Sequence, residues 1–211
     1  MPQTPKKHPG NPLRKRDAAA TRAAILRSAR DAFARAGYDG VGVREIAGSA
    51  GVTAMLVNRY FGSKEELFAE VVADVMARPI ILTERRLRSS RGGDDLAATL
   101  VSITAADGAL LDGFAILSRS ASSARAAEIG RQQIEAHYQK MLSEALPGDY
   151  ADQRAALLLA FVAGIQIMRQ MIRLSALTQA SPEVLARLLT PIFQQLWTGP
   201  PVRSRGRRRC Q

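Results

Sequence analysis

Apolar residues recur with the period of an α-helix along most of this chain, and this periodicity restricts the fold more than any other feature. The clearest stripe, in residues 17–36, consists of Ile25, Ala29, Ala32, Phe33 and Ala36. Gly37 follows the stripe, where a glycine in the left-handed conformation commonly ends a helix. Signals for β-strands are almost absent. The periodicity therefore predicts an all-α protein.

Capping residues divide the rest of the chain into further helices. Thr53 is a good N-cap, Ser63 and Glu66 have the spacing of a capping box, and Ser181 followed by Pro182 is a strong helix start. The expected helices span residues 17–36, 43–50, 53–60, 63 to about Pro79, 95–105, 109–119, 123–145, 151–176 and 182–197.

Glycine, proline and acidic residues refine three of these boundaries. Pro79 should end or kink the helix that contains it, and Pro191 should kink the last helix. Asp94 or Asp95 can cap the helix after the Arg91–Gly93 loop.

The positive charge of the chain is concentrated at its two ends. The 211 residues include 30 Lys and Arg against 19 Asp and Glu, a net charge of +11. Ten of the basic residues lie in residues 1–16 and 203–211, which contain no acid, so the rest holds 20 basic and 19 acidic residues. We expect both ends to be disordered basic arms suited to an anionic polymer or surface, or simply solvated tails without a partner.

The expected location is the cytoplasm. The only cysteine, Cys210, excludes an intrachain disulfide, and the start of the sequence lacks the apolar stretch of a signal peptide. The longest apolar run, residues 155–165, is shorter than the roughly 20 residues that cross a bilayer. We interpret this run as a buried helix and expect no membrane partner.

Residues 43–61 have the features of a helix-turn-helix. This motif needs two short helices that pack tightly through small residues, with a turn that glycine permits. Ala47 allows the close approach, Gly51 permits a positive φ in the turn, and Val52, Val57 and Phe61 can anchor the second helix. The second helix would then read DNA in the major groove.

Lys64 gives a separate indication of a phosphate partner. It lies in the first turn of a predicted helix, where the helix dipole disfavours a cation. A phosphate bound at this helix start would reverse the penalty, or Glu65 and Glu66 would offset it.

Residues 18–70 resemble the DNA-binding domain of the TetR (tetracycline-repressor-like) family. The resemblance runs through TRAAILRSARDAFARAGYDG, VREIAGSAGV and NRYFGSKEELF. It implies an N-terminal three-helix DNA-binding domain (17–62) and a larger helical domain (63–199) for effector binding and dimerisation. Segments 1–16 and 200–211 form the basic arms.

The resemblance also implies roles for individual residues. Arg44 looks like the family residue that reaches a guanine edge or a phosphate, and Lys64 falls on a phosphate-binding position. The positions that usually face bases carry Thr53, Ala54, Met55 and Leu56, and those that usually grip phosphates carry Asn58 and Tyr60. Val41 and Gly42 depart from the pattern, because the usual Thr or Ser cap is missing. Met55 and Leu56 depart from it too; they either read thymine methyls and DNA shape or pack inward.

The basic residues just before the first helix, Arg14, Lys15 and Arg16, could reach phosphates or a minor groove. Arg59 could face either DNA or solvent. We expect the N-terminal arm to add affinity and salt dependence without sequence choice.

The resemblance implies a homodimer formed through residues 151–197 and a small-molecule effector bound within residues 95–175; an ordinary intrachain core is the alternative for the last two helices. The candidate effector residues are Leu110, Phe114, Leu117, Tyr138, Met141, Phe161, Ile165, Gln166, Met168, Arg169 and Met171. Most of them also fit a plain core, and Gln166 and Arg169 are the polar members that could orient a ligand.

Enzymatic motifs are missing. The two histidines and one tail cysteine assemble neither a zinc site nor a Cys–His pair, so we expect no metal, no cofactor and no catalysis. The hypothesis is a DNA-binding repressor acting on double-stranded operator DNA. Two alternatives remain: a helical small-molecule-binding protein or enzyme with a vestigial helix-turn-helix, and a general DNA-coating protein driven by its basic ends.

Overall fold

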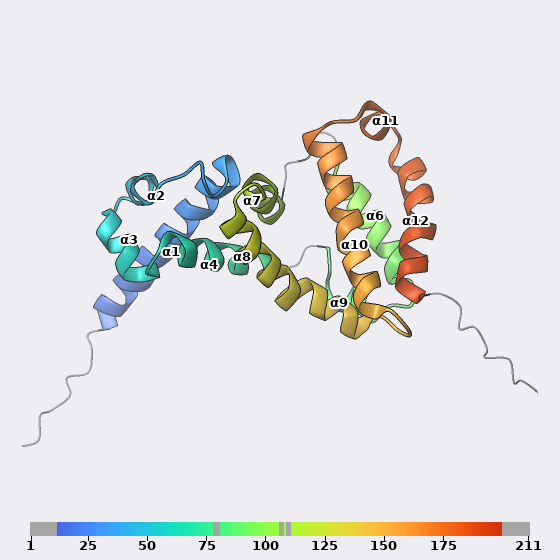
Figure 1. Ribbon diagram of the computed structural model, residues 1–211, viewed down its shortest axis with the longest axis horizontal. Coiled ribbons are helices and arrows are strands. Elements are labelled where there is room, and N and C mark those ends of the chain that lie inside the picture. The colour runs from blue at the N-terminus through green and yellow to red at the C-terminus, as the bar shows by residue number, and fades with distance from the viewer. Residues whose placement is uncertain (1–11, 78–80, 106–107, 109–110, 200–211) are drawn as a thin grey trace, which may run out of the picture. The chain divides into compact units, whose positions relative to one another are not determined.

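Every regular element in the computed structural model is helical within the residues it describes, which are 12–77, 81–105, 108 and 111–199 (Figure 1). The expectation of an all-α fold is confirmed. The expectations for Pro79, Leu110, the chain before residue 12 and the tail with Cys210 lie outside these residues. The helices are α1 (Pro12–Ala36), α2 (Val43–Ser49), α3 (Ala54–Phe61), α4 (Lys64–Met76), α5 (Glu84–Leu87), α6 (Gly92–Ile103), α7 (Asp112–Ser120), α8 (Ala124–Ile134), α9 (Lys140–Ala145), α10 (Ala151–Gln166), α11 (Ser175–Thr178) and α12 (Pro182–Thr198), with π-helical turns η1 (Glu135–Gln139) and η2 (Ile167–Met171).

The chain forms two compact units. Unit 1 contains the residues up to Val75 together with Asp112–Arg131, and unit 2 contains Met76–Leu111 and the residues from Gln132 onward. Contacts therefore group α7 and most of α8 with the N-terminal helices. The boundary at residue 62 in the sequence analysis came instead from the family resemblance, which marks the end of the DNA-binding domain.

Unit 1 is built on the apolar stripe of α1. Ile25, Ala29 and Phe33 are fully buried. The ring of Phe68 in α4 packs edge-on against Phe33 and Tyr38, with 5.1 Å between ring centroids in both pairs. This aromatic cluster fixes α4 against α1.

The segment between α1 and α2 receives α7 at close range. The backbone N–H of Tyr38 donates to Ser120 Oγ at 2.9 Å, and Arg119 Nη1 donates to the carbonyl of Ala34 at 2.9 Å. Gly37 has a φ of +71°, and any Cβ there would collide with the Arg119 carbonyl. Glycine is therefore required at residue 37 both by its backbone conformation and by the approach of α7.

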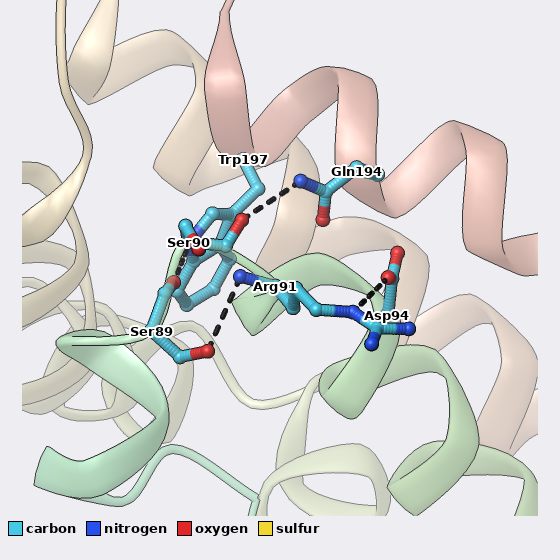
Figure 2. Close-up of polar contacts among 6 residues, drawn as sticks. All are labelled: Ser89, Ser90, Arg91, Asp94, Gln194 and Trp197. Carbon is cyan, nitrogen blue, oxygen red and sulfur yellow. Dashed lines mark hydrogen bonds and ion pairs between the residues drawn. The ribbon is translucent and has the colours of Figure 1, made fainter.

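Unit 2 is centred on the packing of α6 against α12, which lie side by side in Figure 1. Gly92 and Gly93 bring the start of α6 against the end of α12, because a Cβ on Gly92 would overlap the ring of Trp197. Trp197 Nε1 donates to the Ser89 carbonyl at 3.1 Å and Gln194 Nε2 donates to the Ser90 carbonyl at 2.9 Å (Figure 2). The first bond satisfies the indole N–H of the buried Trp197, and the second lies at a more exposed part of the contact.

The capping predictions hold at three helices and fail at one. Thr53, Ser63 and Ser181 accept hydrogen bonds from the backbone N–H groups three residues ahead. The prediction for Asp94 or Asp95 is wrong: α6 begins at Gly92, so both aspartates lie in its first turn. Asp94 instead pairs with Arg91 Nε at 3.2 Å (Figure 2). The two extra residues at the start of α6 are Gly92 and Gly93, which pack closely against α12.

Several helix boundaries differ from those expected. α1 begins at Pro12, which suits the first turn of a helix, so the backbone of residues 14–16 is helical. The helix expected over 151–176 ends instead at Met171: Arg173 adopts a φ of +59°, and the N–H of Leu174 bonds back to the Met168 carbonyl at 2.9 Å. This is the geometry of a left-handed helix stop.

The helix formed by α10 and η2 is only partly covered. Leu158 is buried, whereas Leu157 is 48% exposed, so the expectation that the apolar run is a buried helix is correct for one face only. By length and composition alone, Ala151–Met171 is the one helix among the described residues that could cross a membrane, and 22% of its apolar window is buried. A single such helix is weak evidence for a membrane span.

Candidate functional site

The turn between α2 and α3 has the geometry that a helix-turn-helix needs. Gly51 has a φ of +69°, and the N–H of Val52 bonds to the Ala47 carbonyl at 2.9 Å. Ala47 is buried, as are Val57 and Phe61 on the inner side of α3. The small side chain and the positive φ together bring α3 close to α2, as the sequence predicted.

The outer side of α3 is presented to solvent. Met55 is 81% exposed, which answers whether it packs inward, and Asn58 and Arg59 are also exposed. Thr53 is exposed at the helix start, and the remaining predicted contact residues, Ala54, Leu56 and Tyr60, are partly exposed. Seven neighbouring side chains of α3 and its cap are therefore accessible to a duplex.

The supporting helix α2 contributes Arg44, which is exposed. Its neighbour Glu45 is engaged elsewhere, since Arg35 Nη2 lies 3.1 Å from the Glu45 carboxylate. Gly42 occupies the N-cap of α2 without a side-chain hydrogen bond, so the cap that the sequence analysis found missing is missing in the structure too.

Lys64 lies over an aromatic ring at the start of α4. Its Nζ is 4.3 Å from the centroid of Tyr38, a cation–π contact that holds the ammonium group near the surface of unit 1. Burial, and then the hydrogen bond to Glu65, raise the pKa of Tyr38 to about 12. The pKa of Glu65 is lowered by its own backbone N–H, by Ser63 and by the Tyr38 hydroxyl. Glu65 thus occupies part of the helix start that the sequence analysis considered for phosphate.

Two arginines of α1 form long-range ion pairs within unit 1 that were not found from the sequence. Arg22 forms an ion pair with Glu70, and its guanidinium carbon lies 4.8 Å from the centroid of Phe61. Arg30 Nε lies 3.4 Å from the Asp112 carboxylate. Helical spacing places both arginines beside the apolar stripe. The partners just named are about 40 or more residues away in the sequence, so no local pattern predicts these pairs.

The candidate effector residues fall into both units. Phe114 and Leu117 belong to α7 in unit 1, and the others described belong to unit 2. Tyr138 and Met141 are partly buried against the core of unit 2, as is Ile165, and burial raises the pKa of Tyr138.

The remaining effector candidates divide between two faces of one helix. Gln166 and Arg169 are each 4% exposed and lie on the inner face of α10 and η2. Phe161 and Met168 are 38% and 43% exposed, with Leu157 on the outer face. The inner face is thus polar at its end, and the outer face is apolar.

A short helix that exposes polar and apolar side chains on its outer side and is joined to the preceding helix by a glycine turn is typical of a DNA-binding protein of the helix-turn-helix type. Residues 25–71 match the family model of the bacterial regulatory proteins of the tetR family. Residues 91–196 match that of the tetracyclin repressor-like C-terminal domain. The chain belongs to the TetR family of transcriptional regulators.

Solved structures agree with this assignment at the level of the fold. A TetR-family regulator from Streptomyces coelicolor is 22% identical, with a TM-score of 0.53 and coverage of 92% of this chain and 100% of its own. A transcriptional regulator from Rhodococcus sp. Rha1 is 25% identical, with a TM-score of 0.55 and coverage of 83% and 95%. NalD of Pseudomonas aeruginosa, the secondary repressor of the MexAB-OprM multidrug efflux pump, is 21% identical, with a TM-score of 0.59 and coverage of 86% and 98%. No curated protein sequence matches the chain.

Proposed function

We propose that this chain is a homodimeric repressor that binds a palindromic operator in the bacterial cytoplasm, at the nucleoid, and is released by a small molecule. The observation that carries the DNA-binding part is the outer side of α3: Met55, Asn58 and Arg59 are exposed while Val57 and Phe61 hold the helix from within. An exposed methionine on a short, well-anchored helix has no role in the core of unit 1, whereas a thymine methyl offers it an apolar contact.

The contacts divide by chemistry. We assign base contacts to Thr53, Ala54, Met55 and Leu56, and phosphate contacts to Asn58, Tyr60 and Lys64. Arg44 reaches a guanine edge or a phosphate through its fork of N–H donors. Arg14, Lys15 and Arg16 add phosphate contacts from the first turns of α1.

The dimer is supported by the apolar residues that unit 2 leaves uncovered. Leu188 and Ile192 of α12 are 61% and 39% exposed, and Leu157, Phe161 and Met168 share the outer face of α10 and η2. Gly164 lies within the same face, and a Cβ there would meet nothing within 4 Å, so another helix has room to approach. We propose that a second copy covers these exposed apolar residues of α10, η2 and α12, within residues 151–197. A palindromic operator would then require the two reading helices of the dimer to stand about 34 Å apart.

Release by an effector requires the ligand to bind one spacing of the reading helices better than another. We propose that the ligand binds in unit 2 and that α4, which runs from the reading unit to Met76, carries the change.

Footprinting on the DNA that flanks the gene of this protein tests the proposal. The full-length protein should protect a palindrome and bind it in preference to random DNA, with affinity that falls as salt rises. Arg44→Ala should weaken operator binding about tenfold or more, whereas Arg187→Ala, which removes the same charge from an exposed position on α12, should change it little. Equal binding to operator and random DNA would refute the proposal.

The same variants separate the alternatives. If the helix-turn-helix were vestigial, Arg44→Ala would leave both ligand binding and DNA binding unchanged. If the basic ends drove general DNA coating, deletion of residues 1–16 and 203–211 would abolish all binding. An operator-reading dimer should keep its sequence preference after that deletion and lose affinity only.

A further inference from the structure

The inner face of α10 and η2 ends in a polar cluster that packs beside the apolar core of unit 2. Gln166, Arg169 and Gln170 follow one another at helical spacing, and the first two are each 4% exposed. They lie against the end of α6, because Arg169 Nη1 donates to the Val101 carbonyl at 2.8 Å and to Thr104 Oγ1 at 2.7 Å. A buried cation at this place requires a physical explanation.

Arg169 has no acidic partner among the described residues. Its acceptors are two carbonyls and a hydroxyl, the third bond running from Nε to the Leu177 carbonyl at 3.3 Å. Within the described part of the chain, Nη2 donates no hydrogen bond. Burial lowers the pKa of Arg169.

A second buried arginine in the same unit provides an internal comparison. Arg154 is 5% exposed and also has no acidic partner in the part of the chain that the structure describes, but all three of its guanidinium nitrogens are used. They donate to the carbonyls of Asp149, Leu196, Trp197 and Pro147, two of which lie at the C-terminal end of α12. The negative end of that helix offsets the charge. Arg154 is therefore a complete structural cap, and Arg169 is a cap with one nitrogen left over.

The glutamines beside Arg169 are also incompletely bonded. Gln166 Oε1 is buried without a hydrogen-bond partner among the described residues, and so is Gln170 Oε1. An amide rotated by 180° presents N–H in place of oxygen, so Gln166, three residues before Arg169, can supply a donor on the same helical face. Their neighbours Val162, Ile165 and Leu177 are apolar and pack on the core.

From these groups we propose that Arg169, assisted by Gln166, binds the carboxylate of an otherwise apolar small molecule. This deepens the proposed effector role and rests on it. A carboxylate accepts two parallel N–H bonds and supplies the negative charge that the site lacks. Apolar side chains around the cluster suit the remainder of such a molecule.

The test uses three probes that share one tail and differ only in their head group: decanoate, decanol and decylamine. Their binding to the full-length protein without DNA is measured by calorimetry. Decanoate should bind at least about tenfold more tightly than decanol, and decylamine most weakly, because a hydrogen bond to a charged group is worth that ratio or more. Arg169→Gln should remove the preference for decanoate, whereas Arg169→Lys should keep part of it.

Gln166→Glu provides a second variant that does not depend on losing the arginine. It places a carboxylate three residues from Arg169 on the same helical face, so the protein should melt at a higher temperature and bind decanoate at least about tenfold more weakly. Both results would support the proposal.

Equal binding of the three probes, binding of none at millimolar concentration, or an unchanged preference in Arg169→Gln would overturn it. In the last case Arg169 would be a cap of α6 only. Operator binding by the protein without probes is measured in parallel, so that failure of the DNA-binding proposal is recognised separately.

Discussion

The two units of this chain distribute polarity in opposite ways. Unit 1 buries an aromatic cluster and exposes a mixed surface on α2 and α3, with Arg44 and Asn58 in solvent. Unit 2 exposes an apolar row that includes Leu188 and buries the cation of Arg169. Unit 1 thus presents a largely polar surface, whereas unit 2 leaves apolar side chains uncovered and buries a cation that has no acidic partner among the described residues.

This difference bears on how each unit works. A DNA-reading surface gains from being polar and preformed, because phosphates are met by charge and bases by hydrogen bonds. An uncovered apolar face gains from a second copy, and a buried guanidinium gains from an anion. If the proposed function is correct, unit 1 would meet DNA without rearranging, and unit 2 would supply the contacts to the ligand and to the second copy.

The largest effect should come from the contact that holds unit 2 together. Trp197→Ala removes a buried ring packed on Gly92 and the bond to Ser89, and should lower the free energy of unfolding by about 3–5 kcal/mol. Trp197→Phe keeps most of the packing and should cost less. Urea denaturation measures both, and equal stability of the two variants would show that the packing of the indole ring on Gly92 is unimportant.

The next effect should fall on the exposed apolar residues of α12, which belong to the proposed dimer contact. Leu188→Asp places a charge in the proposed dimer contact and should raise the dimer dissociation constant about a hundredfold. Arg187→Asp, one residue away and also exposed, serves as the control. Sedimentation velocity over a concentration series checks the result. If Leu188→Asp remained dimeric like the control, the second copy would have to bind elsewhere.

The sequence predicted unit 1 well because its signals are local. The caps at Thr53 and Ser63, the positive φ of Gly51 and the period of α1 are each settled within a few residues. The family resemblance then supplied the roles proposed for α3, which local chemistry alone does not give.

Unit 2 was predicted less completely because its features depend on distant partners. The early start of α6 goes with a pair of glycines that meet Trp197 and Gln194, about a hundred residues away. The helix stop after Met171 has Arg173 in a left-handed conformation that favours glycine. Because the residue there is an arginine, the sequence held no glycine signal for the end of this helix. The incomplete bonding of Arg169 is visible only once α6 and α11 are in place.

A smaller effect should separate folding from reading in unit 1. Thr53 caps α3 and also lies on its exposed face, with its Oγ1 3.3 Å from the N–H of Leu56. Thr53→Ala should lower the free energy of unfolding by about 1 kcal/mol and weaken operator binding, whereas Thr53→Ser should keep the cap. Denaturation and operator titration of both variants check this. Thr53→Ser with reduced stability would mean that the methyl group, and not the cap, matters.

The smallest effect concerns pH and should arise in unit 1, from Tyr38 and Glu65. The pKa of Tyr38 is raised from 10.0 to about 12, so the folded state keeps its proton where the unfolded state loses it. Its contribution to stability is complete below pH 10 and should be lost as the pH rises from 10 to about 12. The pKa of Glu65 is lowered, so its contribution is present above the ordinary value of 4.5 and should be lost as the pH falls below it. The free energy of unfolding in urea, measured across pH, checks both expectations. Tyr38→Phe should reduce its fall at alkaline pH, and Glu65→Gln should reduce its fall at acid pH. If the profile of either variant ran parallel to that of the wild type, the Tyr38–Glu65 hydrogen bond would not couple titration to folding.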